Sequence, residues 1–176
     1  MELEFYKYQG TGNDFVMIDN RSNTFPKENT QLVAHLCDRR FGIGADGLIL
    51  LDTDATTDFR MVYYNSDGNL SSMCGNGGRC LVAFAKKLNV IQNETTFIAT
   101  DGLHHATVGA DGIVSLQMID VAEIKIVLGL GLVIQRGHEH AVVEEVQFES
   151  DVLTPAVRDR RAREALEIGA RVVESP

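Results

Sequence analysis

The segment from Asn76 to Leu88 constrains the fold of this chain more than any other, because its middle is apolar on every side. It reads NGGRCLVAFAKKL, in which Cys80 to Ala85 form an unbroken apolar run that ends at two lysines. A helix that is apolar all round is normally a buried helix. The sequence therefore predicts a central helix over 76–88, with the rest of a small domain packed around it.

The segments on either side of this helix are typical of short strands. Apolar or alternating runs predict strands at Leu3–Tyr8, Phe15–Ile18, Leu48–Leu51, Phe59–Tyr64, Glu94–Ala99, Leu103–Val108 and Ile113–Met118. The glycine-rich segment 10–14 predicts the bend of an opening hairpin, and 65–69 predicts a second tight turn. A further helix is predicted through Leu32 and Cys37, with Asn29 or Thr30 as its N-cap. Because strands outnumber helices and can wrap the central helix, the pattern indicates an α+β fold.

The composition changes near residue 126. All five Lys, all four Tyr and all nine Asn lie within residues 1–126, and the last 50 residues contain none of the three. In proportion, about seven would be expected there. We therefore predict a domain over 1–120 and a divergent C-terminal segment over 121–176. A separate domain, a fused tag and a stretch read in another frame of the gene each explain the change.

Two features of the C-terminal segment are better explained by solvent exposure than by a binding site. Thr154 and Pro155 predict the start of a helix that runs to Ile168, and its mixed charges favour a solvated face over an anion-binding patch. His138 and His140 flank an acidic residue and would share one face of a strand. With no third ligand nearby, a solvated strand end is favoured over a metal site.

Charge and cysteine content exclude several classes of protein. Sixteen basic against 25 acidic side chains give a net charge of −9, which disfavours a nucleic-acid partner. No run approaches the roughly 18 to 20 apolar residues of a membrane span, and the first 20 residues carry five charges where a signal peptide would be apolar. We therefore expect a cytoplasmic protein without a membrane partner. Three cysteines without paired spacing predict neither a disulfide scaffold nor a metal site.

Cys74 is the candidate reactive group. It lies just ahead of the predicted central helix, where unpaired backbone N–H groups and the positive end of the helix dipole favour the thiolate form of a cysteine. The glycines that follow leave the same N–H groups open to a substrate carboxylate. A small carboxylate-bearing molecule held there would present its α-carbon to the sulfur, which indicates proton abstraction or addition at that carbon. Cys37 and Cys80 lie on apolar faces and are expected in the core.

Four segments then resemble one known family. GTGNDF at 10–15, CDRRFGIGADGLILL at 37–51, Asn65-x-Asp67-Gly68 and MCGNGGRC at 73–80 occur in the same order in the N-terminal lobe of diaminopimelate epimerase. The resemblance covers residues 1 to about 120 and implies a mixed sheet curled around the central helix. Proline racemases are less similar, because they typically have His where this chain has Asn76, and relatives of the phenazine-pathway isomerase lack the cysteine.

The resemblance implies an isomerase that interconverts LL- and meso-diaminopimelate without pyridoxal phosphate or any other cofactor. Enzymes of this family use two cysteines on opposite faces of the α-carbon, and Cys74 matches the first of them. By the same match, Gly75 and Asn76 bind the α-carboxylate or amino group of the amino-acid substrate. Asn13 and Asn65 then hydrogen-bond or align its distal end, a role that suits amides because each supplies donors and an acceptor.

The chain differs from the family after residue 126. The family's second lobe supplies an ERG segment and a second cysteine, whereas no cysteine follows Cys80 here. We therefore expect 121–176 to be part of, or a replacement for, the second lobe, and we do not expect the 176-residue chain alone to epimerise its substrate. The alternatives are a non-catalytic lobe that binds diaminopimelate or another carboxylate, an assembly partner, or a proline-racemase-like isomerase. The family implies cytoplasmic lysine biosynthesis, and pairing of two chains as a homodimer stays open.

Overall fold

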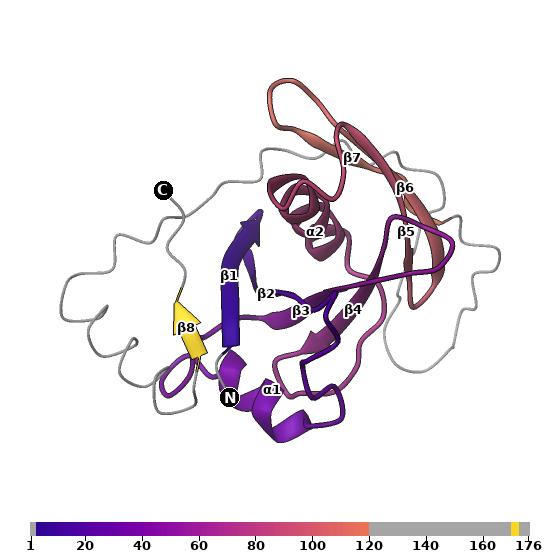
Figure 1. Cartoon of the computed structure of the whole chain (residues 1–176). Helices are drawn as coiled ribbons and strands as arrows, with labels where there is room; N and C mark the ends of the chain where they lie inside the picture. Colours follow the sequence, from indigo (N-terminus) through magenta and orange to yellow (C-terminus); the bar gives the residue numbers. More distant parts are fainter. Residues whose placement is uncertain (1–2, 120–169, 173–176) are drawn as a thin grey trace, which may run out of the picture.

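A computed structural model of the chain describes residues 3–119 and 170–172 (Figure 1). The elements are β1 (Leu3–Gly10), β2 (Asn13–Asp19), α1 (Thr30–Cys37), β3 (Gly47–Asp52), β4 (Phe59–Asn65), α2 (Gly75–Lys87), β5 (Glu94–Ala99), β6 (Gly102–Val108), β7 (Val114–Leu116) and β8 (Ala170–Val172). The predicted helices and strands of the first 119 residues are thus all present, with ends shifted by a few residues.

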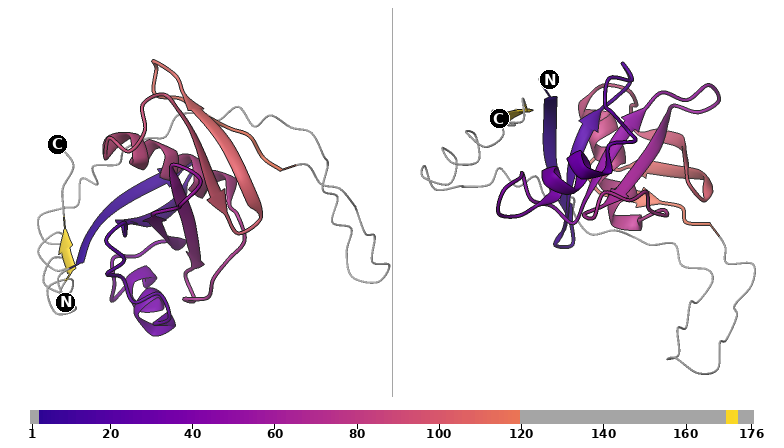
Figure 2. Two further views of the ribbon diagram at one scale, coloured as in Figure 1. Left: turned by 45° about the vertical axis from the view of Figure 1, so that its right-hand side comes forward. Right: turned by 90° about the horizontal axis from the view of Figure 1, so that it is seen from below.

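The strands form one sheet in the order β7-β6-β5-β4-β3-β2-β1-β8. Pairing is parallel for β2 with β3, β4 with β5 and β1 with β8, and antiparallel elsewhere. The sheet is therefore mixed, and two views at different angles show it curving around α2 (Figures 1 and 2). This confirms the expected α+β fold with a mixed sheet curled around a central helix.

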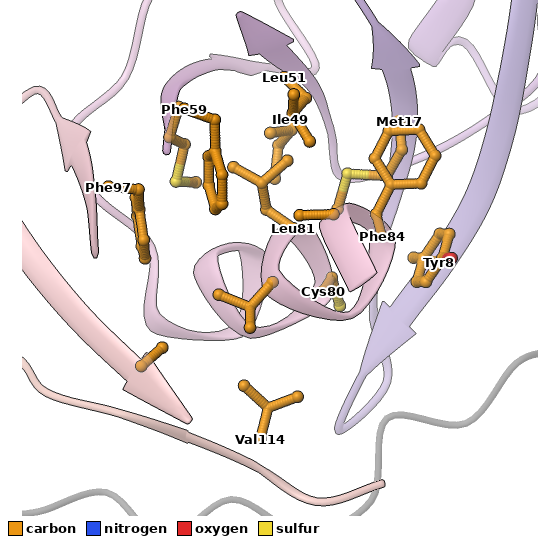
Figure 3. Close-up of a cluster of buried hydrophobic side chains, with 14 of the residues drawn as sticks. Tyr8, Met17, Ile49, Leu51, Phe59, Cys80, Leu81, Phe84, Phe97 and Val114 are labelled. Carbon is orange, nitrogen blue, oxygen red and sulfur yellow. The ribbon is translucent and has the colours of Figure 1, made fainter. Parts of the chain in front are cut away.

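α2 is buried along most of its length, as the sequence predicts. Leu81 and Phe84 have no exposed surface, and they pack with side chains from β2, β3, β4 and β5 (Figure 3). A Cβ added at Gly77 would lie 2.7 Å from the Ile49 Cδ1 atom, so the absence of a side chain lets the helix approach β3 closely. The start of α2 is therefore fixed against the middle of the sheet.

The apolar runs in β2 and β3 are explained by two cores, one on each face of the sheet. Phe15 and Met17 of β2 belong to the cluster around α2, whereas Val16 and Ile18 belong to a second cluster that includes α1 residues. Neighbouring side chains of a strand point to opposite faces. A strand covered on both faces therefore loses the alternation that marks a half-exposed strand.

Local signals at the turns and caps are also confirmed. Thr11 and Gly12 have φ values of 53° and 83° and form the two-residue loop between β1 and β2, as a type I′ hairpin requires. The Asn29 side chain caps α1 by accepting a hydrogen bond of 3.0 Å from the backbone of Leu32. The last predicted strand is shorter than expected and spans only Val114–Leu116; at its start, Ile113 instead closes a turn by accepting a 2.8 Å bond from the backbone of Gly109.

Most of the C-terminal segment lies outside the described residues. This holds for the composition break near 126, the helix predicted over 154–168 and the histidines at 138 and 140. Residues 170–172 are described as β8, which pairs with Leu3 to Phe5 of β1. Neither described helix has the length and apolar content that crossing a membrane requires.

Candidate active site at the start of α2

Cys74 is the residue that immediately precedes α2. Its backbone is extended, with φ −118° and ψ 121°, and its carbonyl accepts the first helical hydrogen bond from Gly78 at 2.8 Å. The N–H groups of Gly75, Asn76 and Gly77 therefore have no acceptor within the helix. The Cys74 side chain caps none of them, and its thiol is half-buried. The structure thus places a thiol beside a set of backbone donors, as the sequence predicts.

Asn13 lies beside this thiol although it is 61 residues away in the sequence. The Cys74 Sγ atom donates to the Asn13 Oδ1 atom at 3.6 Å. The contact forms because the tip of the β1–β2 hairpin lies on the first turn of α2. There the Thr11 hydroxyl donates to the Asn76 side-chain oxygen at 3.3 Å, and a Cβ at Gly10 would lie 3.5 Å from the Asn76 carbonyl. The backbone of the hairpin tip at Gly10 thus lies within van der Waals reach of the first turn of α2.

A network of charged side chains holds Asn13 from the other side. The Asn13 Nδ2 group donates to the Asp46 Oδ2 atom at 2.7 Å, and Arg39 donates to the Asp46 Oδ1 atom at 2.6 Å. Arg39 also binds both carboxylate oxygens of Asp14, at 2.7 and 3.0 Å. Burial raises the pKa of Asp14, but hydrogen bonds from Arg39 and Lys7 outweigh it and hold that pKa below its usual value. Both carboxylates of the network are thus paired with basic groups.

Asn65 lies at the same edge of the sheet but makes no described side-chain contact with Cys74. Register places Gly47 between Phe15 and Asn65, so the start of β2, the start of β3 and the end of β4 lie together. The Asn65 backbone closes the turn that follows, accepting from Gly68 at 2.9 Å. Its side chain is exposed. Of the predicted binding residues, the structure therefore brings the Asn13 side chain to the thiol and places Gly75 and Asn76 in the first turn of α2, directly after Cys74. Asn65 lies on the neighbouring edge of the sheet.

Arg79 is a polar residue of the site that sequence reasoning did not single out. It is 7% exposed, its Nη2 group donates to the Asn76 side-chain oxygen, and its Nε atom has no hydrogen-bond partner among the described residues. Its Nη1 atom would lie 3.4 Å from a Cβ at Gly75, so the guanidinium covers the first turn of α2. Burial lowers its pKa, while the neighbouring Cys80 and Cys74 act in the opposite direction. A single charge within the apolar stretch 77–85 was the signal that could have identified it.

The other two cysteines belong to the core, as predicted. Cys37 is 2% exposed and Cys80 is fully buried. Burial raises the pKa of Cys37 to about 12 and that of Cys80 to about 12. Both thiols are therefore held in the neutral form. In the described part of the chain, no three His, Cys, Asp or Glu side chains come together in a way that could hold a metal ion.

Comparison with solved structures identifies the fold. A probable proline racemase from Agrobacterium radiobacter matches with a TM-score of 0.51 and 18% identity, over 66% of this chain and 41% of that chain. A phenazine biosynthesis protein of the PhzF family from Bacillus anthracis matches with a TM-score of 0.50 and 15% identity, over 67% of this chain and 42% of that chain. The described residues thus have the fold of a lobe shared by these proteins.

Sequence comparison identifies the family within this fold. The diaminopimelate epimerase family model matches residues 5–118. A diaminopimelate epimerase of Flavobacterium psychrophilum is 73% identical over 124 residues, and one of Chlorobaculum tepidum is 39% identical over 170 residues. The chain therefore belongs to the diaminopimelate epimerase family. It aligns with 48% of the length of the first relative and 66% of the second, while the alignments cover 70% and 93% of this chain.

Proposed function

We propose that this chain contributes the Cys74 side of an epimerase that interconverts LL- and meso-diaminopimelate without pyridoxal phosphate. Family membership supports the reaction class, and the names of the relatives support the substrate. The observation that carries the proposal is the position of the Cys74 thiol, directly beside the unpaired backbone N–H groups of α2. A base and an anion-binding group then act on adjacent atoms of one substrate.

The geometry supports the following division of roles. The substrate α-carboxylate accepts hydrogen bonds from the N–H groups at Gly75 and Asn76, which places the α-carbon near the Cys74 sulfur. The thiolate removes the α-proton, and the positive end of α2 stabilises the charge that develops toward the carboxylate. Asn13 and Asn65, at the adjoining sheet edge, hydrogen-bond the distal amino-acid end.

Protection of the thiol tests substrate binding on the chain as it exists. Diaminopimelate should slow the alkylation of Cys74 by iodoacetamide in a saturable way, and lysine, which lacks the second carboxylate, should protect less. The Asn65→Ala variant should weaken this protection, because the exposed Asn65 amide is proposed to bind the distal end of the substrate. Asn69→Ala serves as the matched control, because Asn69 bonds to Asp67 in the exposed turn after β4. Absence of protection at saturating diaminopimelate would contradict the proposal.

Inversion of the substrate should be absent for the 176-residue chain alone. Besides Cys74, the sequence contains only Cys37 and Cys80, and both are buried. We expect no conversion of LL- to meso-diaminopimelate in deuterated water, measured by chiral chromatography and mass spectrometry. Deuterium uptake at the α-carbon with inversion would show that a second proton-transferring group is present in this chain.

The burial of both other cysteines also favours one alternative, a lobe that binds diaminopimelate without reacting. Calorimetry on the wild type and Cys74→Ala separates the two functions when it is combined with the exchange of the α-proton. A pure binding lobe tolerates the substitution and exchanges no proton in either form. We also expect a role in lysine biosynthesis, a cytoplasmic location, and no nucleic-acid or membrane partner; these stay predictions. Pairing of two chains as a homodimer stays open.

A further inference from the structure

The amide of Asn13 lies between a carboxylate and a thiol, and this fixes its orientation. The group 2.7 Å from the Asp46 Oδ2 atom is the Asn13 Nδ2 group, because an ionised carboxylate accepts hydrogen bonds and donates none. The amide oxygen therefore faces Cys74, at 3.6 Å from Sγ. Asp46 is itself held, since Arg39 donates to its Oδ1 atom at 2.6 Å and the backbone of Asp14 donates to its Oδ2 atom at 3.2 Å.

We infer that Asp46 is a positioning residue for Cys74: by orienting the Asn13 amide, it presents an acceptor to the sulfur and favours the protonated thiol. An amide oxygen accepts a hydrogen bond from a protonated thiol. When the thiol is ionised, no proton lies between the oxygen and the sulfur, and the two electron-rich atoms repel each other. The turned amide would present Nδ2 instead, which is a donor to the thiolate. Asp46, the residue before β3, therefore determines whether Asn13 stabilises the protonated thiol or the thiolate of Cys74.

Among the described residues, few other ionisable groups face Cys74. Within α2, Arg79 and Cys80 interact with it electrostatically, and Tyr63 of β4 does so from the sheet. Burial raises the pKa values of Tyr63 and Cys80, so both are neutral near pH 7. Arg79 and the backbone donors of α2 favour the thiolate, and the Asn13 oxygen opposes them. The Asp46–Asn13 pair thus favours the protonated thiol, against the effect of the α2 N-terminus.

This inference deepens the proposed role of Cys74 and rests on it for its meaning in catalysis. The experiment that tests it measures the reactivity of the Cys74 thiol and needs no substrate. Failure of the inference therefore leaves the protection experiment with diaminopimelate unaffected, and failure of that experiment leaves the orientation of Asn13 unaffected.

The experiment measures the alkylation rate of Cys74 by iodoacetamide between about pH 6 and pH 10, with the modified peptide quantified by mass spectrometry. In Asp46→Asn the Asn13 amide is free to turn its Nδ2 group to the sulfur. We expect alkylation near pH 7 to be about fivefold faster and its pH midpoint to fall, since one hydrogen bond typically contributes about that much. Asp54→Asn is the matched control: it also removes a carboxylate paired with an arginine at 2.6 Å, and it should leave the rate unchanged.

A double-mutant cycle separates orientation from the direct effect of removing a negative charge. Asn13→Ala should itself speed alkylation, and Asp46→Asn added to Asn13→Ala should change the rate no further. An equal effect of Asp46→Asn with and without the Asn13 amide would overturn the inference, as would a wild-type rate in Asp46→Asn. Circular dichroism verifies that each variant is folded. If Asp46→Asn does not fold, Asn13→Ala alone tests the inference. An unchanged or slower alkylation rate of Cys74 in Asn13→Ala would show that the Asn13 oxygen does not favour the protonated thiol.

Discussion

Selective alkylation of Cys74 in the native chain is the prediction that follows most directly from the structure. Iodoacetamide reacts with the thiolate form of cysteine. Burial raises the pKa of both Cys37 and Cys80 to about 12, so about one molecule in 10,000 carries either thiolate at about pH 8. A free cysteine of ordinary pKa is about one-quarter ionised at that pH. Ionisation alone therefore slows the buried thiols about 2,000-fold relative to a free cysteine.

Burial adds a second obstacle, because the reagent must reach the sulfur. Cys37 is 2% exposed and Cys80 is fully buried, so both become accessible only when the structure opens locally. The half-buried Cys74 needs no such opening. Mass mapping after timed exposure to iodoacetamide should therefore show one modified site in the native protein and three in strong denaturant. Cys74→Ser should show no modification under native conditions.

The result that would refute this reasoning is specific. If Cys37 or Cys80 were alkylated within about tenfold of the rate of Cys74 under native conditions, neither desolvation nor burial would be controlling reactivity. Resistance of native Cys74 to a reagent that modifies all three thiols of the denatured chain would contradict the prediction equally. Both outcomes are read from the same digest.

Further predictions concern stability. Gly68→Ala should destabilise the chain by clearly more than Gly12→Ala in urea titrations: both residues have positive φ, but only at Gly68 would a Cβ overlap the carbonyl oxygen of the first residue of α1. Phe84→Ala should cost about 3 kcal/mol or more, whereas exposed Leu70→Ala should change stability by less than about 0.5 kcal/mol. The pKa of Asp14 is depressed in the folded chain, so its contribution is fully present above its unfolded value of 3.8 and is lost as the pH falls below it. Between about pH 4 and pH 2, the urea midpoint of Asp14→Asn should therefore fall less than that of the wild type. An equal fall would exclude Asp14 as a cause of the acid destabilisation.

Local sequence patterns predicted the elements of this fold because their causes are local. The buried helix follows from its uninterrupted apolar run, the hairpin from the glycine at its bend, and the α1 cap from Asn29. Each of these signals is read within a few residues. The same is true of the thiol at Cys74, since a residue before a helix is beside its unpaired donors wherever the helix packs.

The contacts that complete the site could not be predicted in this way, because they depend on pairing between distant strands. Asp46 was part of a recognisable segment, but nothing in that segment indicates that it binds Asn13, which is 33 residues away. The contact follows from the parallel register of Phe15 with Gly47. Arg79 was missed for a related reason. Its burial follows from the packing of α2 inside the sheet, whereas an arginine in a helix is ordinarily exposed.

The order of the strands has a consequence for how the chain reaches this structure. From β1 to β7, every strand lies beside the one that precedes it in the sequence, so each can add to an edge that already exists as the chain emerges from the ribosome. Asn13, Asp46 and Cys74 are then assembled as soon as α2 has docked. β1 differs from the other strands, because one of its two neighbours, β8, comes from the far end of the chain. This edge of β1 is synthesised first, but it gains its parallel neighbour only after residues 170–172 have been synthesised.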